Sequence, residues 1–131
     1  MVFLDDVAAY LVTNSIATAV GTDLFTVKMP DAPDVCISLV ERAGMAPDPV
    51  TTIERPGFRV LCRNVDTDAG TLAAYSKAYA IKKLLHRAVG VTMGTTLYHR
   101  IDATGNPTFN GQDQRGRPIY EVSFIATKED E

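Results

Sequence analysis

The 131-residue sequence is poor in residues that bind metals or form disulfides. It contains two cysteines and two histidines, and neither a CxxC nor an HxxxH spacing occurs. A structural zinc site therefore has no ligand set. Cys36 and Cys62 each lie among Val, Ile and Leu in a strand-like run, as buried thiols of reduced proteins do. We predict two free structural cysteines and no metal.

Long hydrophobic runs are also missing. Hydrophobic residues make up 46% of the chain, as in ordinary globular proteins, but no apolar run is long enough to cross a bilayer. We therefore predict no membrane segment. The first residues include Asp5 and Asp6 where a secretory signal needs positive charge. Residues 1–11 are interpreted as an amphipathic helix, with an inward face formed by Leu4, Val7, Ala8 and Leu11.

No nucleophile stands next to a base in this sequence. Ser76 and His86 fall on one predicted helix, about two and a half turns apart, which is too far for contact. His99 has only Asp102 near it in sequence. A glycine-rich phosphate loop is absent as well. We predict that the protein is not an enzyme, with no catalytic residues and no cofactor.

Charge is unevenly distributed along the chain. The formal net charge is −3, but residues 1–41 carry −5, residues 42–117 carry +5 and residues 118–131 carry −3. The fold can balance this asymmetry internally. Alternatively, the acidic surface of one copy can meet the basic surface of another, as in a head-to-tail assembly. The overall acidity argues against general affinity for nucleic acid.

The most informative segment is a strand with arginines on one face. In residues 57–64 the side chains alternate, so that Phe58, Val60 and Cys62 are expected in the core while Arg59, Leu61 and Arg63 point outward. Arg55 extends the arginine row. A row of this kind predicts either a subunit interface, where arginine is enriched, or a solvated sheet face.

A long helix follows this strand. Asp66, Thr67 and Asp68 are candidates for its N-cap. Its inward stripe recurs at helical spacing and comprises Ala74, Ala78, Ile81, Leu85 and Ala88, widened by Leu84 and Val89. The cations at its end, Lys82, Lys83, His86 and Arg87, suit the negative end of the helix dipole and are interpreted as a solvated face.

The remaining segments predict strands and loops. Strands are expected at residues 24–29, 35–41, 96–102, 107–112 and 119–126. The 35–41 strand is apolar on both faces and is expected in the middle of the sheet. Residues 42–56 contain Gly44 and three prolines, so we expect a long loop with few paired residues, and long loops often bind partners.

Between the last two strands, Asp113 and Gly116 predict a tight hairpin turn. Arg115 and Arg117 lie on that turn, and we treat Asp113, Arg115 and Arg117 as candidates for contact with another subunit, beside the simpler interpretation as turn chemistry. The predicted fold is one α+β domain over residues 1–131. It has a mostly antiparallel sheet of about five strands, two helices on one face, and an acidic tail at residues 127–131 that extends into solvent.

The order of these motifs resembles a known family. The motifs are MPDAPD before a strand (VCISLVE), a Gly/Pro-rich loop, a strand ending in arginine (FRVLCRN), a helix ending KKLLHR, a D-x-x-G-R hairpin and an aromatic strand (YEVSF). Over residues 3–126 this order resembles the tail terminator and minor capsid (head–tail joining) proteins of long-tailed bacteriophages. Each motif alone is weak, but their sequence and spacing together are more specific.

The resemblance implies a virion structural protein that works through its surfaces. Such proteins form a ring, expected to be a hexamer, that caps the tail tube, stops its polymerisation and joins the tail to a neck or head completion protein. Genomic DNA would pass through the channel without specific binding. The expected location is the head–tail junction, after assembly in the host cytoplasm. The alternatives are another head–tail connector or tail-completion adaptor, or a small cytosolic α+β enzyme or ligand-binding subunit.

The subunit or tube interface is expected to draw on both arginine-rich segments. The six candidate residues are Arg55, Arg59, Arg63, Asp113, Arg115 and Arg117.

Overall fold

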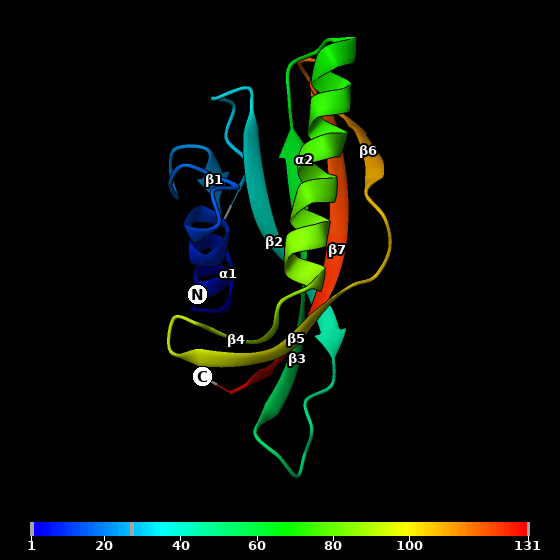
Figure 1. Cartoon of the computed structure of the whole chain (residues 1–131). Helices are drawn as coiled ribbons and strands as arrows, with labels where there is room; N and C mark the ends of the chain where they lie inside the picture. Colours follow the sequence, from blue (N-terminus) through cyan, green and yellow to red (C-terminus); the bar gives the residue numbers. More distant parts are fainter. Residues whose placement is uncertain (1, 27, 131) are drawn as a thin grey trace.

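The computed structural model describes residues 2–26 and 28–130 (Figure 1). Two helices and seven strands follow one another in the order α1 (Val2–Thr13), β1 (Leu24–Phe25), β2 (Cys36–Met45), β3 (Ile53–Arg63), α2 (Asp68–His86), β4 (Val89–Met93), β5 (Thr96–Ala103), β6 (Thr108–Gln112) and β7 (Pro118–Glu129). Residue 27 of the predicted 24–29 strand lies outside the described residues.

All seven strands form one curled, mixed sheet. Their order is β1-β2-β3-β7-β5-β4. β5 pairs with the second half of β7, and β6 pairs with its first half, near Pro118–Glu121. The pair β1–β2 is parallel and the other pairs are antiparallel. The α+β class is confirmed, but the expected five-stranded sheet is too small. The prediction missed β4, because Val89 had been counted with the helix, which ends two residues earlier at its C-cap Arg87.

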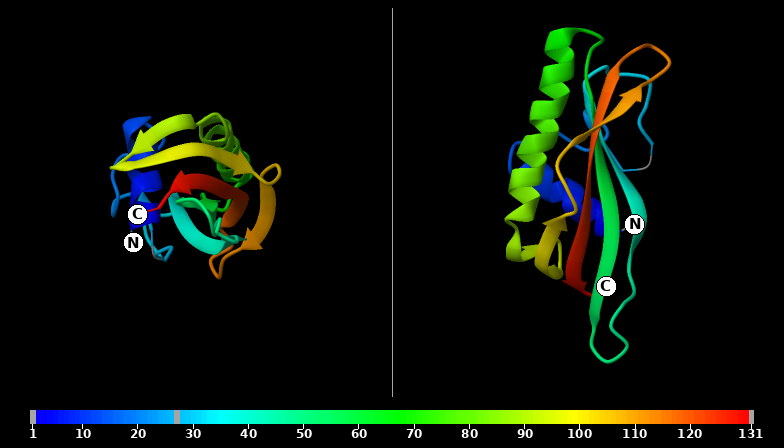
Figure 2. Two further views of the ribbon diagram at one scale, coloured as in Figure 1. Left: turned by 90° about the horizontal axis from the view of Figure 1, so that it is seen from below. Right: turned by 90° about the vertical axis from the view of Figure 1, so that its right-hand side faces the viewer.

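Both helices lie on the same side of the sheet and enclose the core (Figures 1 and 2). The inward residues predicted for the first helix are all buried. They meet Phe58 of β3, which packs edge-on against Phe3 with ring centroids 5.4 Å apart and stacks on Phe124 at 5.1 Å. Burying these aromatic and aliphatic side chains is the main force that holds the layers together.

The structure of α2 agrees with the capping segment and the apolar spacing predicted from the sequence. Thr67 is the N-cap, and its hydroxyl accepts a hydrogen bond from the backbone N–H of Gly70 at 2.9 Å. The helix packs on β3, β5 and β7. The inward stripe predicted from its spacing is fully buried at Ala74, Ala78, Ile81 and Leu85. Neither helix among the described residues is long and apolar enough to span a membrane.

The predicted long loop at residues 42–56 is in large part a hairpin. β2 continues to Met45 and β3 begins at Ile53, with a bulge between Arg42 and Met45. At Gly44 a Cβ atom would collide with the carbonyl oxygen of Arg55, so only glycine lets the two backbones approach here. The hairpin projects beyond the rest of the sheet (Figure 2).

Two further expectations are wrong. The 35–41 strand does not lie in the middle of the sheet, since only the two-residue β1 lies beyond it and β3 and β7 occupy the centre. Residues 127–129 are not a solvated tail, because β7 continues to Glu129. Lys128 is only 1% exposed, and its ammonium donates to a carboxylate oxygen of Glu54 at 3.0 Å. This tertiary partner keeps a charged residue within the sheet.

Candidate interaction surfaces

The described residues contain no group of three or more His, Cys, Asp or Glu side chains that could hold a metal ion. Cys36 and Cys62 are free and buried. Burial raises the pKa of both thiols, that of Cys62 to about 12. Because the thiolate is the reactive form, both cysteines are inert at neutral pH.

One end of the sheet is fixed by an arginine clamp, formed by Arg63 of β3 and Arg117 beside β7. Arg63 Nε donates to the carbonyl oxygen of Asp34 at 3.1 Å, and its Nη2 donates to the carbonyl oxygen of Pro33 at 2.6 Å. Arg117 Nη1 donates to the carbonyl oxygen of Asp31 at 2.6 Å and to the Asp34 carboxylate at 2.9 Å. These charge-assisted bonds hold residues 31–34 against the sheet.

Asp113 supports the clamp from the β6–β7 turn. Its carboxylate accepts hydrogen bonds from the backbone N–H groups of Arg115 (3.0 Å) and Arg117 (2.9 Å) and from Arg117 Nε at 2.7 Å. Partial burial alone would raise the pKa of Asp113, but these bonds outweigh it and lower that pKa. The tight turn predicted at Asp113 and Gly116 is confirmed by the bond from the Gly116 N–H to the Asp113 carbonyl oxygen, at 3.0 Å.

The structure brings four of the six candidate residues together at the clamped end of the sheet and leaves Arg59 and Arg55 further along β3, so the six do not form one outward row. Arg63 and Arg117 do not point to solvent, because residues 31–34 cover them and their exposed fractions are 4% and 5%. This correction follows from a loop distant in sequence, which strand alternation cannot reveal. Arg59 is half-buried and pairs with Glu121 of the same chain at 3.3 Å.

The other two arginines lie at opposite ends of the sheet. Arg115 is exposed on the turn and forms an ion pair with Asp31 at 2.9 Å. Arg55 is half-buried at the base of the projecting hairpin, and no carboxylate among the described residues forms an ion pair with it. The charge of Arg115 is therefore already balanced within the chain, whereas the charge of Arg55 is not balanced by an ion pair among the described residues.

An aromatic face covers one side of the molecule, and we define it as Leu72, Tyr75 and Tyr79 of α2, Phe109 of β6 and Tyr120 of β7. The rings form a continuous series: Tyr79 stacks on Tyr75 (6.1 Å between centroids), which meets Tyr120 edge-on at 5.5 Å, and Tyr120 meets Phe109 at 5.5 Å. Leu72 is 68% exposed and Phe109 is 49% exposed.

Cations border this face. The ammonium groups of Lys82 and Lys83 lie 5.4 Å and 5.9 Å from the centre of the Tyr79 ring. The aromatic face was not predicted from the sequence. Its signal was present, since Leu72, Tyr75 and Tyr79 recur at helical spacing as a second apolar stripe beside the core stripe of α2.

The third surface is the hairpin tip, defined as residues 46–52. Val50 is 89% exposed, and Met45 just before the tip is 55% exposed. At the base of the hairpin, Arg55, Met45, Pro47 and Phe3 line part of a groove of about 390 Å³. Within the tip, the Val50 N–H donates to the Asp48 carboxylate at 2.9 Å. Thr52 joins the tip to the end of the chain, since its hydroxyl donates to Glu129 at 2.9 Å and its carbonyl oxygen accepts from the Asp130 N–H at 2.8 Å.

Comparison with known proteins gives one family match and one structural match. The sequence family described as bacteriophage tail terminator protein matches residues 10–130 of this chain. Among solved structures, the fold is similar to a chain of the virion of a native gene transfer agent particle. The TM-score is 0.68 at 19% identity, and the alignment covers 95% of this chain and 93% of that chain. A search of curated protein sequences finds no match.

Proposed function

Since this chain belongs to the bacteriophage tail terminator family, a family of virion structural proteins, we propose that it forms a ring that caps the tail tube. The ring stops polymerisation of the tube and joins the finished tail to the head. The observation that carries this proposal is the family match, which spans nearly the whole chain. The likeness to a chain from a phage-like particle supports the fold over the same extent.

The features of the surface support a protein that works by binding other proteins. The described residues combine exposed apolar side chains on α2 and β6 with a projecting hairpin, and they contain no metal-ligand group. A ring needs one contact repeated head to tail about a closed rotation, so each copy must offer two different lateral surfaces. We propose a hexamer, placed at the head–tail junction after assembly in the host cytoplasm.

The two ends of the sheet suit partners above and below the ring. Arg55 and Arg63 are eight residues apart on β3, which corresponds to roughly 26 Å of extended strand. We propose that the hairpin tip and Arg55 contact the tube or the neck protein at one end, while Arg115 and the clamped loop contact the other partner. Arg59 lies between the ends and contributes to the same sheet face. Genomic DNA passes through the ring without specific binding.

Prolines make the hairpin tip suited to docking. Pro47 and Pro49 restrict its freedom before binding, so the tip loses less entropy on docking than a glycine-serine loop of equal length. Exposed Val50 and Met45 supply apolar surface that contacts in the free chain do not cover. This pairing of restricted backbone and exposed apolar side chains supports the assignment of the tip as a contact element.

Tube length tests the proposed function. Tail-tube subunits are allowed to polymerise with and without the purified protein, and tubes are measured by negative-stain electron microscopy. A terminator shortens and caps the tubes in proportion to its concentration, whereas heat-unfolded protein has no effect. A different tail-completion adaptor would bind a head-side protein and leave tube length unchanged, and that result would contradict the terminator assignment.

A further inference from the structure

We propose that the aromatic face of α2, β6 and β7 is the surface by which each copy of this chain binds the next copy in the ring. This inference rests on the proposed ring and identifies its lateral contact. Tyrosine and other aromatic residues are enriched at the centres of protein interfaces, and exposed Leu72 and Phe109 extend the face beyond the tyrosines.

The aromatic face is already ordered before a partner binds. The rings of Tyr75, Tyr79, Tyr120 and Phe109 contact one another in series. The helix that carries two of them is fixed to the sheet through its opposite stripe, which includes the fully buried Ala78 and Ile81. Docking therefore immobilises few additional side chains, and this lowers the entropic cost of association.

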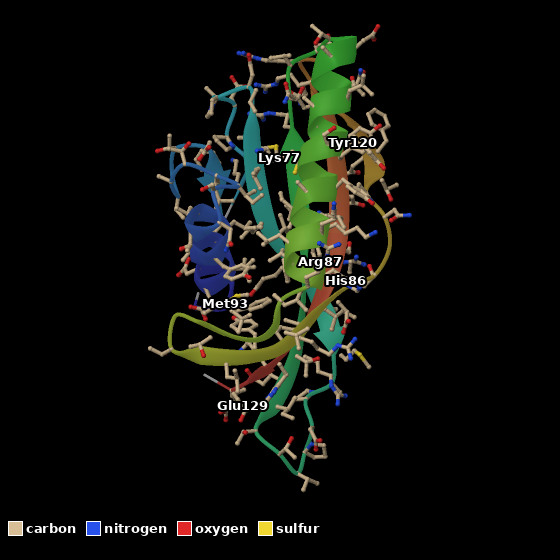
Figure 3. The ribbon with its side chains drawn as sticks, viewed as in Figure 1. Lys77, His86, Arg87, Met93, Tyr120 and Glu129 are labelled. Carbon is tan, nitrogen blue, oxygen red and sulfur yellow. The ribbon has the colours of Figure 1, made fainter. Side chains whose placement is uncertain are left out.

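The position of the aromatic face suits a lateral neighbour. α2 runs along the long axis of the molecule, between the clamped end and the projecting hairpin (Figure 1). In Figure 3 the labelled Tyr120 lies on the β6 side of this helix and Lys77 lies on the side of α1. A partner above or below the ring would meet the ends of the sheet, whereas the next copy in the ring would meet the flank.

Charge identifies a second copy as the occupant. Lys83 and Arg87 at the end of α2 form no ion pair among the described residues, so the border of the aromatic face is positive. The first third of the sequence, residues 1–41, has a formal charge of −5 and forms α1, β1 and most of β2 on the opposite flank, away from β6 (Figures 1 and 2). Two of its acids, Asp31 and Asp34, pair with arginines at the clamped end, whereas Asp23 forms no ion pair among the described residues.

The opposite flank also offers apolar surface. Val20 and Val35 are about half exposed there, and Glu41 has no ion-pair partner among the described residues. A positive aromatic flank and a negative flank with exposed valines, on opposite sides of one subunit, are the complementary pair that a closed head-to-tail contact needs.

Photo-cross-linking in assembled tails identifies the occupant. The photoreactive amino acid p-benzoyl-phenylalanine is placed at position 79 in one variant and, as a matched control, at position 50 on the hairpin tip in another. The position-79 variant should give a ladder of this chain linked to itself, with linked peptides from residues 1–41. The position-50 variant should link to a different virion protein. Links from position 79 to the tube or neck protein, or no links, would overturn the inference.

A substitution pair measures how much the aromatic face contributes. The variant Tyr75→Glu with Tyr79→Glu should keep the wild-type melting temperature. It should reduce the amount of ring that sediments together with tail tubes at least tenfold relative to wild type. The control Tyr75→Phe with Tyr79→Phe keeps the aromatic rings and should form rings of the protein as the wild type does. Rings that persist in the glutamate variant contradict the inference alone. Wild-type protein that binds tube ends as a single copy contradicts the proposed ring itself.

Discussion

The tripeptide Ala-Pro-Asp occurs twice in this protein, at residues 32–34 and at residues 46–48, and the two copies lie at opposite ends of the sheet. The first copy is bound by the arginine clamp, through bonds from Arg63 and Arg117 to its backbone and to the Asp34 carboxylate. The second lies in the hairpin tip, where Asp48 bonds to the N–H of Val50 two residues later.

This difference shows that local composition does not decide whether a loop is fixed. Both loops are short, polar and rich in proline. The first is held by two arginines that reach it from segments distant in sequence. The second is tied to the end of the chain only at its last residue, Thr52, whose hydroxyl donates to the Glu129 carboxylate at 2.9 Å, and the described residues include no arginine that holds it. We infer that the clamped loop is part of the folded framework and that the tip is free to bind.

Substitution of one arginine at each end of β3 should give the largest difference in stability between the two ends of the sheet. Arg63→Met removes a buried cation and leaves the carbonyl oxygens of Pro33 and Asp34 without their donor, so we expect a loss of about 3–5 kcal/mol in the free energy of unfolding. Arg55→Met, the matched change on the same strand, should stay within about 0.5 kcal/mol of wild type. Urea denaturation measures the free energy of unfolding of both variants. Equal losses would contradict the difference between the clamped end and the hairpin end.

Substitution of the two equivalent aspartates, Asp34 and Asp48, should give a smaller difference in stability. Asp34→Ala removes the carboxylate that accepts from Arg117 at 2.9 Å, and because that side chain is more than half exposed we expect a loss of about 0.2–1 kcal/mol. Asp48→Ala should leave the unfolding transition in place, since its carboxylate bonds only within the tip. Thermal and urea unfolding of both variants test this. A larger loss at Asp48 would mean that the tip is part of the framework.

The clamp should also give the stability a particular pH dependence. The folded-state pKa of Asp113 lies below its ordinary value of 3.8, so its carboxylate stabilises the fold above that pH, and this contribution is lost as the pH falls through the folded pKa. The variant Asp113→Asn should therefore show a shallower drop in melting temperature between pH 5 and pH 2. A parallel drop in both proteins would contradict the role of Asp113.

Replacement of the tip should have the smallest effect on stability and a large effect on assembly. Residues 46–51 are exchanged for a short glycine-serine linker, which leaves Gly44 and its approach to Arg55 intact. The melting temperature should change little, because the removed side chains lie outside the core, while joining of tails to heads should be lost. Infectious particles at normal yield would show that the tip contacts no essential partner.

Sequence patterns predicted those parts of the fold that depend on neighbours along the chain. The inward stripes of both helices, the Thr67 cap and the turn at Asp113 follow from spacing and from the chemistry of single residues. The burial of Arg63 and Lys128 could not be predicted in this way, because their partners lie in loops and strands distant in sequence.

The same limit applies to the candidate surfaces. Alternation along β3 correctly set Phe58, Val60 and Cys62 apart from Arg59 and Arg63, but it could not show that residues 31–34 fold over one of those arginines. The aromatic face forms only when α2, β6 and β7 lie next to one another in the folded chain. Only its helical part, Leu72, Tyr75 and Tyr79, could have been recognised from spacing alone.

Limited proteolysis of the two Ala-Pro-Asp loops tests the central contrast most directly. An aspartate-specific protease is applied to the free protein and to assembled tails, and the cut sites are identified by mass spectrometry. We predict that residues 31–35 resist cleavage in both states because the clamp holds their backbone, whereas residues 46–52 are cut in the free protein and become resistant in tails. Equal cleavage of the two loops in the free protein, or a tip that is still cut in tails, would contradict this contrast.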